Sequence, residues 1–436
     1  MRVPSVVDIP TAFRSIWAGL DPDGFFRRQT GRRDPFTVAF PGLGPVHFFA
    51  SADAARDLLT APAEILEAPT PNPIEPIVGK NSVILISGED HRSKRRMLMG
   101  ALHGQRMRAR AEMMARAASE ESAAWRPGRR IPIATAARSI TLRIIVLAMF
   151  GVENAEGYQE VADVATALMH ANTAPLMLLP WLRKEFAGLG PWARLIRLRA
   201  RFDALLSRQV RTSRPDSADP SVLGVLLTGK NAAAMDPDDF HQQLRTLVVA
   251  GHDTTAGALM WALYHIHREP TIRDRAVAEL NGVSSAAALP ALPYLSAVVS
   301  EALRMHPAVP IVMRRLTAPL TVGGLAWEPG DIIGIAVPAV HFDPTIWADP
   351  NRFNPDRFLA KAPTPFEYLP FGGGFRRCPG AAFAAYELAI SIGTLMNSVE
   401  LRMSKRERRR RPPRSVPRGI AVVPRREVRL DVIRRR

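Results

Sequence analysis

The sequence has 436 residues, of which 47% are hydrophobic and 23% charged, and this composition excludes a wholly disordered chain. Its length predicts either about three domains or one large domain with a sizeable core. The single cysteine excludes an internal disulfide and favours a reducing compartment.

The net charge of +17 is concentrated near the C-terminus. Residues 401–436 contain 15 Lys and Arg against 3 acidic residues, whereas residues 1–400 carry a net charge of only +5. A basic segment can bind nucleic acid, an acidic membrane or an acidic protein, but it is more often a solvated tail. Because the rest of the chain is nearly balanced, we expect no nucleic-acid partner.

Neither a membrane span nor a secretion signal is evident in the sequence. A transmembrane helix needs about 18 apolar residues, and the run at 144–151 is much shorter. Residues 1–20 lack the apolar core of a signal peptide. We therefore expect no transmembrane anchor and a cytoplasmic location.

The first elements are short. Residues 21–28 are typical of a short helix, and the apolar runs within 37–50 flank a Pro-Gly-Leu-Gly turn that predicts a hairpin. Ser51 is a suitable N-cap for a helix that continues to residue 59. Several prolines within 61–82 exclude one continuous helix there. From residue 90 the pattern becomes mainly helical.

One long helix is marked clearly at its start. Asp236 is a suitable N-cap, Pro237 suits the first helical position, and apolar periodicity continues to about His267. Thirty-two residues at about 1.5 Å rise give about 48 Å, enough to cross a whole domain.

The remaining pattern predicts a minor sheet within a helical protein. A helix is expected over 294–305, short strands over 309–337, a structured loop over 338–377, and a final helix over 380–396. The fold class is therefore mainly α with minor β sheets, in one large domain.

The lone cysteine, Cys378, lies in an unusual loop that begins at Phe371 with three glycines and continues through Arg376 and Arg377. Glycines allow close backbone approach, while the arginines and a following helix favour a thiolate. A lone cysteine is often simply buried structure. One thiol cannot build a zinc or iron–sulfur site, and no histidine is near in sequence to activate a nucleophile, but haem iron needs only one axial thiolate.

The loop spacing Phe-x-x-Gly-x-Arg-x-Cys-x-Gly resembles the haem-binding loop of the cytochromes P450. Three further signatures resemble that family in the same order: Ala250–Thr255, Glu301–Arg304, and Pro355–Phe358 after Trp347–Pro350. The resemblance covers roughly residues 20–430. It implies a cytochrome P450 domain over 21–430, an N-terminal extension over 1–20, and a basic segment over 401–436 that overlaps the end of the domain.

The resemblance also implies the cofactor, haem b (iron protoporphyrin IX), with Cys378 as the metal ligand. The residues that it places against the cofactor are His91, Arg95, Ala250, Arg314, Phe371, Arg376, Cys378 and Gly380. His91, Arg95, Arg314 and Arg376 would bind the haem propionates, and Arg315 is a competitor of Arg314. Read alone, the basic cluster around residue 94 is a solvated face.

Asp253 and Thr254 lie midway along the long helix. Read alone, this stretch is helix packing with a tolerated Gly251, which costs about 1 kcal/mol relative to alanine. The resemblance implies catalytic roles instead: Thr254 helps deliver protons during oxygen activation, and Asp253 relays them.

Glu301 and Arg304 are spaced to share one helix face. Taken alone, such a pair usually lies on the surface. The resemblance implies a buried, structural pair that is joined by Arg357.

The function implied is that of a haem-thiolate monooxygenase acting on an apolar small molecule of terpene, fatty acyl or polyketide type. Dioxygen and a ferredoxin or flavodoxin-type electron donor with its NAD(P)H reductase are the implied partners, and Arg92, Arg96 and Arg377 could bind that donor. Residues 62–86, 168–184, 243–254 and 309–313 would line the substrate pocket. A peroxygenase or isomerase of the same fold is disfavoured by the Asp253–Thr254 pair, and a non-enzymatic haem sensor or basic nucleic-acid binder remains as a rival.

Overall fold

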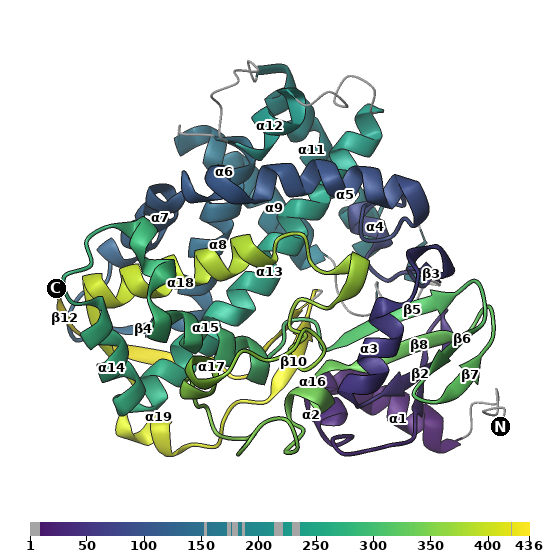
Figure 1. Ribbon diagram of the computed structural model, residues 1–436. Coiled ribbons are helices and arrows are strands. Elements are labelled where there is room, and N and C mark those ends of the chain that lie inside the picture. The colour runs from purple at the N-terminus through teal and green to yellow at the C-terminus, as the bar shows by residue number, and fades with distance from the viewer. Residues whose placement is uncertain are drawn as a thin grey trace.

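The computed structural model describes residues 9–151, 155–171, 176, 182–184, 188–212, 221–228, 236–419 and 421–436. Figure 1 shows a large helical region beside a smaller region that is built on a sheet. The N-terminus lies at the sheet end, and the C-terminus lies at the opposite, helical end (Figure 1).

The principal helices are those of the large region. They are α5 (Gly88–Leu102), α7 (Ala111–Ala123), α8 (Ile133–Phe150), α9 (Ala155–Ala171), α11 (Gly190–Thr212), α12 (Val222–Thr228), α13 (Pro237–Arg268), α14 (Pro270–Leu280), α15 (Pro293–Met305) and α18 (Ala381–Ser398). Shorter helices are α1 (Ile9–Leu20), α2 (Pro22–Arg27), α3 (Ala52–Thr60), α4 (Glu75–Val78), α6 (Gly104–Arg108), α16 (Val337–His341), α17 (Asp356–Ala360) and α19 (Lys405–Arg409). The 3-10 turns among the described residues are η1 (Ala63–Ile65), η3 (Ala286–Ala291) and η4 (Gly374–Arg376).

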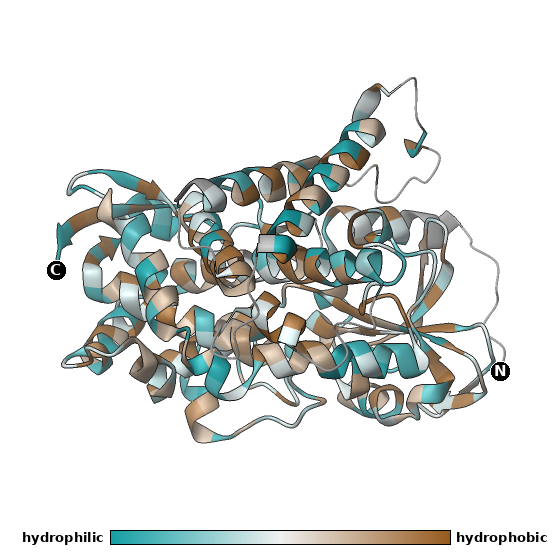
Figure 2. Ribbon diagram, turned by 90° about the horizontal axis from the view of Figure 1, so that it is seen from above, coloured by the Kyte–Doolittle hydropathy of each residue, from teal (hydrophilic) through white to brown (hydrophobic). Residues whose placement is uncertain are grey.

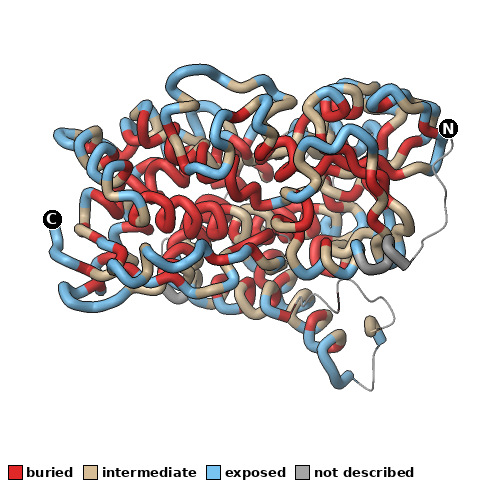
Figure 3. Tube along the Cα trace, turned by 90° about the horizontal axis from the view of Figure 1, so that it is seen from below, coloured by how far each residue is buried: buried red, intermediate tan, exposed pale blue. Residues whose placement is uncertain are grey.

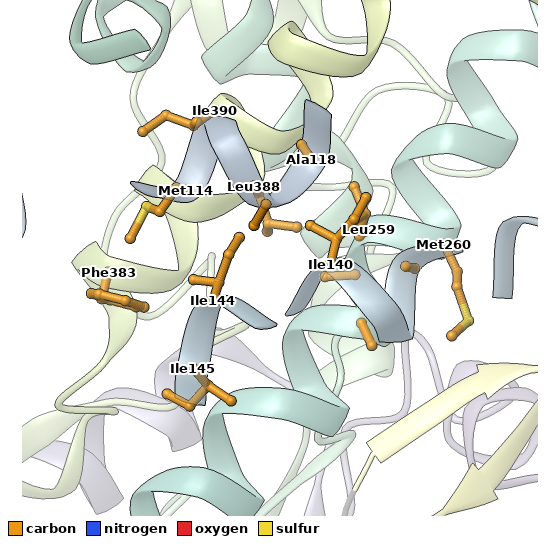
Figure 4. Packing of buried hydrophobic residues seen from close by; sticks show 14 of the residues in the cluster. Met114, Ala118, Ile140, Ile144, Ile145, Leu259, Met260, Phe383, Leu388 and Ile390 are labelled. Atoms are coloured by element: carbon orange, nitrogen blue, oxygen red, sulfur yellow. The ribbon is translucent and has the colours of Figure 1, made fainter. Parts of the chain in front are cut away.

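The long helix α13 confirms the predicted start, end and length. The carboxylate of Asp236 accepts the backbone N–H of Asp238 at 2.9 Å, and Pro237 is the first helical residue. The helix has 32 residues and is buried along most of its length. It forms the axis of the large core, where it packs against α8 (Figure 4). Figure 4 shows Ile140 and Ile144 of α8 close to Leu259 of α13 and Leu388 of α18.

Helix α8 is longer than the apolar run that was recognised in the sequence. Its 18 residues have a mean hydropathy of 1.7, so by length and composition it could cross a membrane, the one such helix among the described residues. The expectation of no helix long enough to span a membrane rested on the apolar run at 144–151, which corresponds only to the second half of α8. Of this helix, 61% is buried inside the fold. Its packing against α7 and α13 accounts for its apolar composition.

The smaller region contains a five-stranded sheet in the order β1-β2-β8-β5-β3. The strands are β1 (Phe36–Phe40), β2 (Gly44–Phe49), β3 (Leu66–Glu67), β5 (Ile311–Leu316) and β8 (Ile332–Ala336). Strands β1 and β2 form the predicted antiparallel hairpin, with Phe36 opposite Phe48. Helix α1 covers β1 and buries Ala18, so this helix packs onto the sheet.

The basic C-terminal segment is folded rather than a free tail. Strand β12 (Arg429–Arg435) lies between β4 (Arg130–Pro132) and β9 (Val399–Arg402), while β10 (Ser415–Arg418) and β11 (Ala421–Pro424) form a hairpin. A fourth sheet pairs β6 (Leu320–Val322) with β7 (Leu325–Trp327). Figure 2 shows hydrophobic and hydrophilic residues alternating along the outer helices. Figure 3 shows that buried residues lie along the middle of the molecule and exposed residues at its edges.

Candidate haem-thiolate site

Cys378 lies at the end of a tight loop that leads into α18. Its backbone N–H donates to the carbonyl of Phe371 at 2.9 Å, which closes the loop. Gly374 has φ of +65°, and a Cβ there would lie 2.3 Å from the carbonyl oxygen of Leu59. Only glycine fits this position without moving backbone. Gly380 is the N-cap of α18, so the loop and the helix fix the sulfur from both sides.

The surroundings of Cys378 do not favour a thiolate in the polypeptide alone, contrary to the sequence expectation. Burial is the largest effect and raises the pKa of the thiol. The backbone N–H of Gly380 and the charges of Arg95 and Arg377 oppose this shift without overcoming it. Arg376 contributes little, because it turns away and donates to the carbonyl of Ile86 at 2.5 Å. Ionisation of the sulfur therefore requires a further positive partner, which a ferric iron would supply.

Four cationic or titratable side chains gather near this loop from separate elements. They are His91 and Arg95 of α5, Arg314 of β5, and Arg376 of the loop itself. Arg95 donates to the carbonyl of Arg377, and the His91 ring packs edge-on against Phe375. The fold therefore brings the predicted propionate-binding residues together.

The cationic cluster has few acidic neighbours, and of these Glu67 acts on Arg376 through its charge. Within the described residues, none of the four forms an ion pair with a carboxylate. The Nε atoms of Arg314 and Arg376 are buried without a hydrogen-bond partner. Burial, with the charge of Arg376, lowers the pKa of Arg314 to about 9. Burial and the neighbouring arginines lower the pKa of His91 to about 4. Two carboxylates placed here would neutralise the cluster and use its free N–H groups, so these residues fit haem.

Arg314 and Arg315 differ in environment. Arg314 is buried, and its guanidinium donates to the carbonyl of the neighbouring residue, Met313, at 2.7 Å. Arg315 points the other way along the strand and donates to the carbonyl of Thr70 at 2.7 Å. Alternation along β5 therefore separates the two side chains and favours Arg314 for the propionate.

The middle of α13 is partly accessible although the helix around it is buried. Ala250, Asp253 and Thr254 are of intermediate exposure, whereas His252 and Thr255 between and beside them are buried. The Thr254 hydroxyl donates to the carbonyl of Ala250 at 2.6 Å. This bond holds the hydroxyl group against the preceding turn of its own helix.

Asp253 has an unusual ionisation. Its side chain is 13% exposed, and burial raises its pKa from 3.8 to about 6, although Arg418 and Arg138 pull it down. A carboxyl group with this pKa can exchange protons near neutral pH. The adjacent His252 is no ligand candidate, because its Nδ1 is hydrogen-bonded to the hydroxyl of Thr141 at 2.9 Å and burial lowers its pKa to about 3.

The fold brings Glu301, Arg304 and Arg357 into one network. Arg304 makes two hydrogen bonds to Glu301, at 2.7 and 2.9 Å, and neither side chain is exposed. Arg357 reaches the same carboxylate at 3.1 Å. Further bonds from Arg304 to the carbonyls of His341 and Pro350 attach the network to the chain that precedes the cysteine loop.

Some sequence expectations are refined. Of the three arginines proposed for the electron donor, Arg96 and Arg377 are exposed, but Arg92 is paired with Glu64 and Glu89. His265 is bonded to His306 rather than to a metal, and no cluster of three metal-ligating side chains occurs within the described residues. Parts of the proposed substrate-lining segment 168–184, namely residues 172–175 and 177–181, lie outside the described residues.

A mainly helical chain with one thiol in a glycine-rich loop, and an unneutralised cationic cluster beside it, has the features of a haem-thiolate protein. A profile of the cytochrome P450 family matches residues 16–429. The chain therefore belongs to the cytochrome P450 family. It is a haem-dependent monooxygenase of that family.

Individual relatives agree with this assignment. A protein described as cytochrome P450 138 of Mycobacterium tuberculosis is 30% identical over 434 residues, which cover 97% of this chain and 95% of the relative. Cytochrome P450 135B1 of the same organism is 31% identical over 373 residues, covering 84% and 78%. The structure of a retinoic-acid-bound cyanobacterial cytochrome P450, CYP120A1, matches the fold with a TM-score of 0.82 at 22% identity, covering 97% of this chain and 96% of that chain.

Proposed function

We propose that this monooxygenase places one oxygen atom of dioxygen on an apolar small molecule, with Cys378 as the axial ligand of its haem. The other oxygen atom leaves as water, and the balance takes two electrons and two protons per product. Haem, when bound, supplies the oxidation chemistry. The observation that carries the ligand assignment is the lone thiol beside buried, unneutralised arginines.

The chain's own contribution is proton control at α13. Thr254 holds a hydroxyl in a fixed position through its 2.6 Å bond to Ala250, and Asp253 carries an exchangeable proton near neutral pH. A positioned proton donor contributes typically about 10²–10⁴-fold to rate. Asp253 would pass its proton towards Thr254 and regain one from solvent.

The proton role is tested by product yield rather than by rate alone. Thr254→Ala should retain haem and substrate binding but divert a larger share of NADPH consumption to hydrogen peroxide, because protonation is no longer directed. Thr255→Ala is the matched control, since Thr255 is buried and lies next in the helix. Equal product per NADPH in Thr254→Ala and in the native enzyme would remove Thr254 from the mechanism.

The ligand assignment has its own test. Cys378→Ala should abolish the thiolate-type spectrum of the carbon-monoxide-bound ferrous protein, because the chain contains no other thiol. Persistence of that spectrum would contradict the assignment.

The substrate is proposed as a terpene, fatty acyl chain or polyketide. Apolar residues of the proposed lining that the structure describes, such as Leu168 and Leu176, are buried and uncharged. A spectral-shift screen of apolar ligands against the purified ferric protein would identify the class. Binding confined to polar or charged ligands would refute it.

Electrons are proposed to come from a separate ferredoxin or flavodoxin-type protein. Arg96 and Arg377 support this, because they are exposed cations on the side that carries the cysteine loop and α5. Arg96→Glu should weaken binding of the electron donor, and the binding that remains should depend less on salt concentration. Arg14→Glu is the control, because Arg14 is an exposed arginine of α1 at the sheet end of the molecule.

A further inference from the structure

The proposed proton relay residue lies directly under the C-terminal hairpin. A Cβ on Gly419 would be 2.6 Å from Oδ2 of Asp253, so the carboxyl group packs against the turn between β10 and β11. Gly419 has φ of +56°, which also favours glycine. The hairpin lies against α13, because a Cβ on Gly257 of that helix would be 3.2 Å from the carbonyl oxygen of Val422. The N–H of Val422 also donates to the carbonyl of Ala308 at 2.9 Å.

The residue before this glycine, Arg418, connects the turn to the molecular surface. Its guanidinium contacts Nε2 of His170 at 2.9 Å, and His170 is exposed on α9. An arginine can only donate, so Nε2 of His170 accepts and that nitrogen carries no proton. Burial, followed by the charges of Arg418, Arg138 and Arg194, lowers the pKa of His170, which keeps the ring neutral.

The charges around Asp253 come from three packed elements. Arg418 on the hairpin is the larger of two cationic influences on this carboxyl group, and Arg138 on α8 is the smaller. His252, the neighbour on α13, has Nε2 3.8 Å from Oδ1 of Asp253 but is neutral. Glu427 acts on Arg138 from the end of the hairpin segment.

We propose that Arg418, held in place by His170, is a positioning residue that keeps the Asp253 carboxyl group ionisable and opens it to solvent. A buried acid without a nearby cation would hold its proton too tightly to release it in each cycle. Arg418 transfers no proton itself, because a guanidinium does not deprotonate in proteins. Asp253 releases its proton inward and takes the replacement from water beside Arg418. This inference rests on the proposed relay role of Asp253.

The direct test is a pH titration of Asp253 by infrared difference spectroscopy on the resting holoprotein. The carboxyl band is assigned by its loss in Asp253→Asn. Arg418→Gln should raise the apparent pKa of Asp253 above about 6, by about one pH unit, as expected for loss of a nearby opposite charge. Arg418→Lys should restore most of the native value. Arg425→Gln is the matched control, because Arg425 is an exposed arginine of the same segment.

His170 is tested in the same way. His170→Leu removes the acceptor and should raise the apparent pKa of Asp253 in the same direction as Arg418→Gln but by less. His170→Gln keeps an acceptor and should preserve the native titration. In both Arg418→Gln and His170→Leu, the pH profile of product per NADPH should move to higher pH together with the titration.

The result that overturns the proposal is an unchanged titration in Arg418→Gln, or a larger shift in Arg138→Gln than in Arg418→Gln. The relay role itself is tested separately by Asp253→Asn. If that variant keeps the native product per NADPH while Arg418→Gln still shifts the titration, the relay role fails and the Arg418–Asp253 coupling stands.

Discussion

The backbone N–H of Leu369 donates a 2.7 Å hydrogen bond to Nε2 of His341. The other ring nitrogen, Nδ1, is 2.8 Å from the carbonyl oxygen of Arg304. Burial lowers the pKa of His341 to about 3, so the ring is neutral, donates through Nδ1 and accepts through Nε2. This one imidazole therefore joins the buried Glu301–Arg304 pair to the segment that enters the cysteine loop.

His341→Phe should destabilise the protein and loosen the cysteine loop. The substitution leaves a buried N–H and a buried carbonyl without partners, at a cost of about 1–3 kcal/mol for each group. Urea unfolding and the retained haem fraction measure both effects. His103→Phe, at a half-buried position on another helix end, is the control. Equal losses in the two variants would contradict a special role for His341.

Arg304→Ala should be far more harmful than removal of a surface arginine. It leaves the Glu301 carboxylate buried with one partner fewer, which costs about 3–5 kcal/mol. The exposed pair Arg275–Asp356 at 2.6 Å provides the comparison, and Arg275→Ala should cost less than about 1 kcal/mol. Chemical unfolding of both variants measures the difference. If both variants lost a similar free energy of unfolding, burial of the Glu301–Arg304 pair would not make its disruption more costly.

Arg314→Gln should weaken haem retention, whereas Arg315→Gln should not. Both Nε atoms are buried without a hydrogen-bond partner, but the Arg314 side chain is buried as a whole, whereas Arg315 is half-buried and its guanidinium donates to the carbonyl of Thr70. The rate of haem transfer to an apo-haemoprotein acceptor measures retention. Faster loss from the Arg315 variant would reverse the assignment.

Asp253→Asn should stabilise the protein in a pH-dependent manner. Folded Asp253 holds its proton up to about pH 6, whereas the free side chain titrates near 3.8. Between these values the folded protein binds more protons than the unfolded chain, so its free energy of unfolding falls as pH rises and levels off above about 6. This penalty amounts to about 3 kcal/mol at pH 7.

Urea unfolding at pH 4.5 and 7.5 checks this expectation. The asparagine variant should gain about 2–3 kcal/mol over native protein at the higher pH and little at the lower one. Asp274→Asn, which alters an exposed carboxylate, should show no such trend. A gain that is independent of pH would exclude ionisation of Asp253 as its cause.

Local signals explain what could be predicted from the sequence. Asp236 and Pro237 mark the start of α13 because capping depends only on neighbouring residues, and the glycine spacing before Cys378 reflects a local close approach. Burial of Glu301 and Arg304 was expected only through the family resemblance, since their spacing alone suits a surface pair equally well.

Long-range contacts explain what could not be predicted. His341 meets Arg304 across 37 residues, and Arg418 meets His170 across 248, so no spacing rule indicates either contact. The raised pKa of the Cys378 thiol was missed for a related reason: nearby arginines are visible in the sequence, but the depth of burial that outweighs them is not.

The place of β12 in its sheet has a consequence for biosynthesis. This strand, which ends at Arg435, lies between β4 near residue 130 and β9 near residue 400. A nascent chain therefore cannot pair β4 with β12 until the residues of β12 have left the ribosome. The hairpin over Asp253 is also made of late residues, so the proposed proton site is completed only after most of the described chain has been synthesised. Fusion of a bulky partner directly after Arg436 should delay this step more than fusion at the N-terminus.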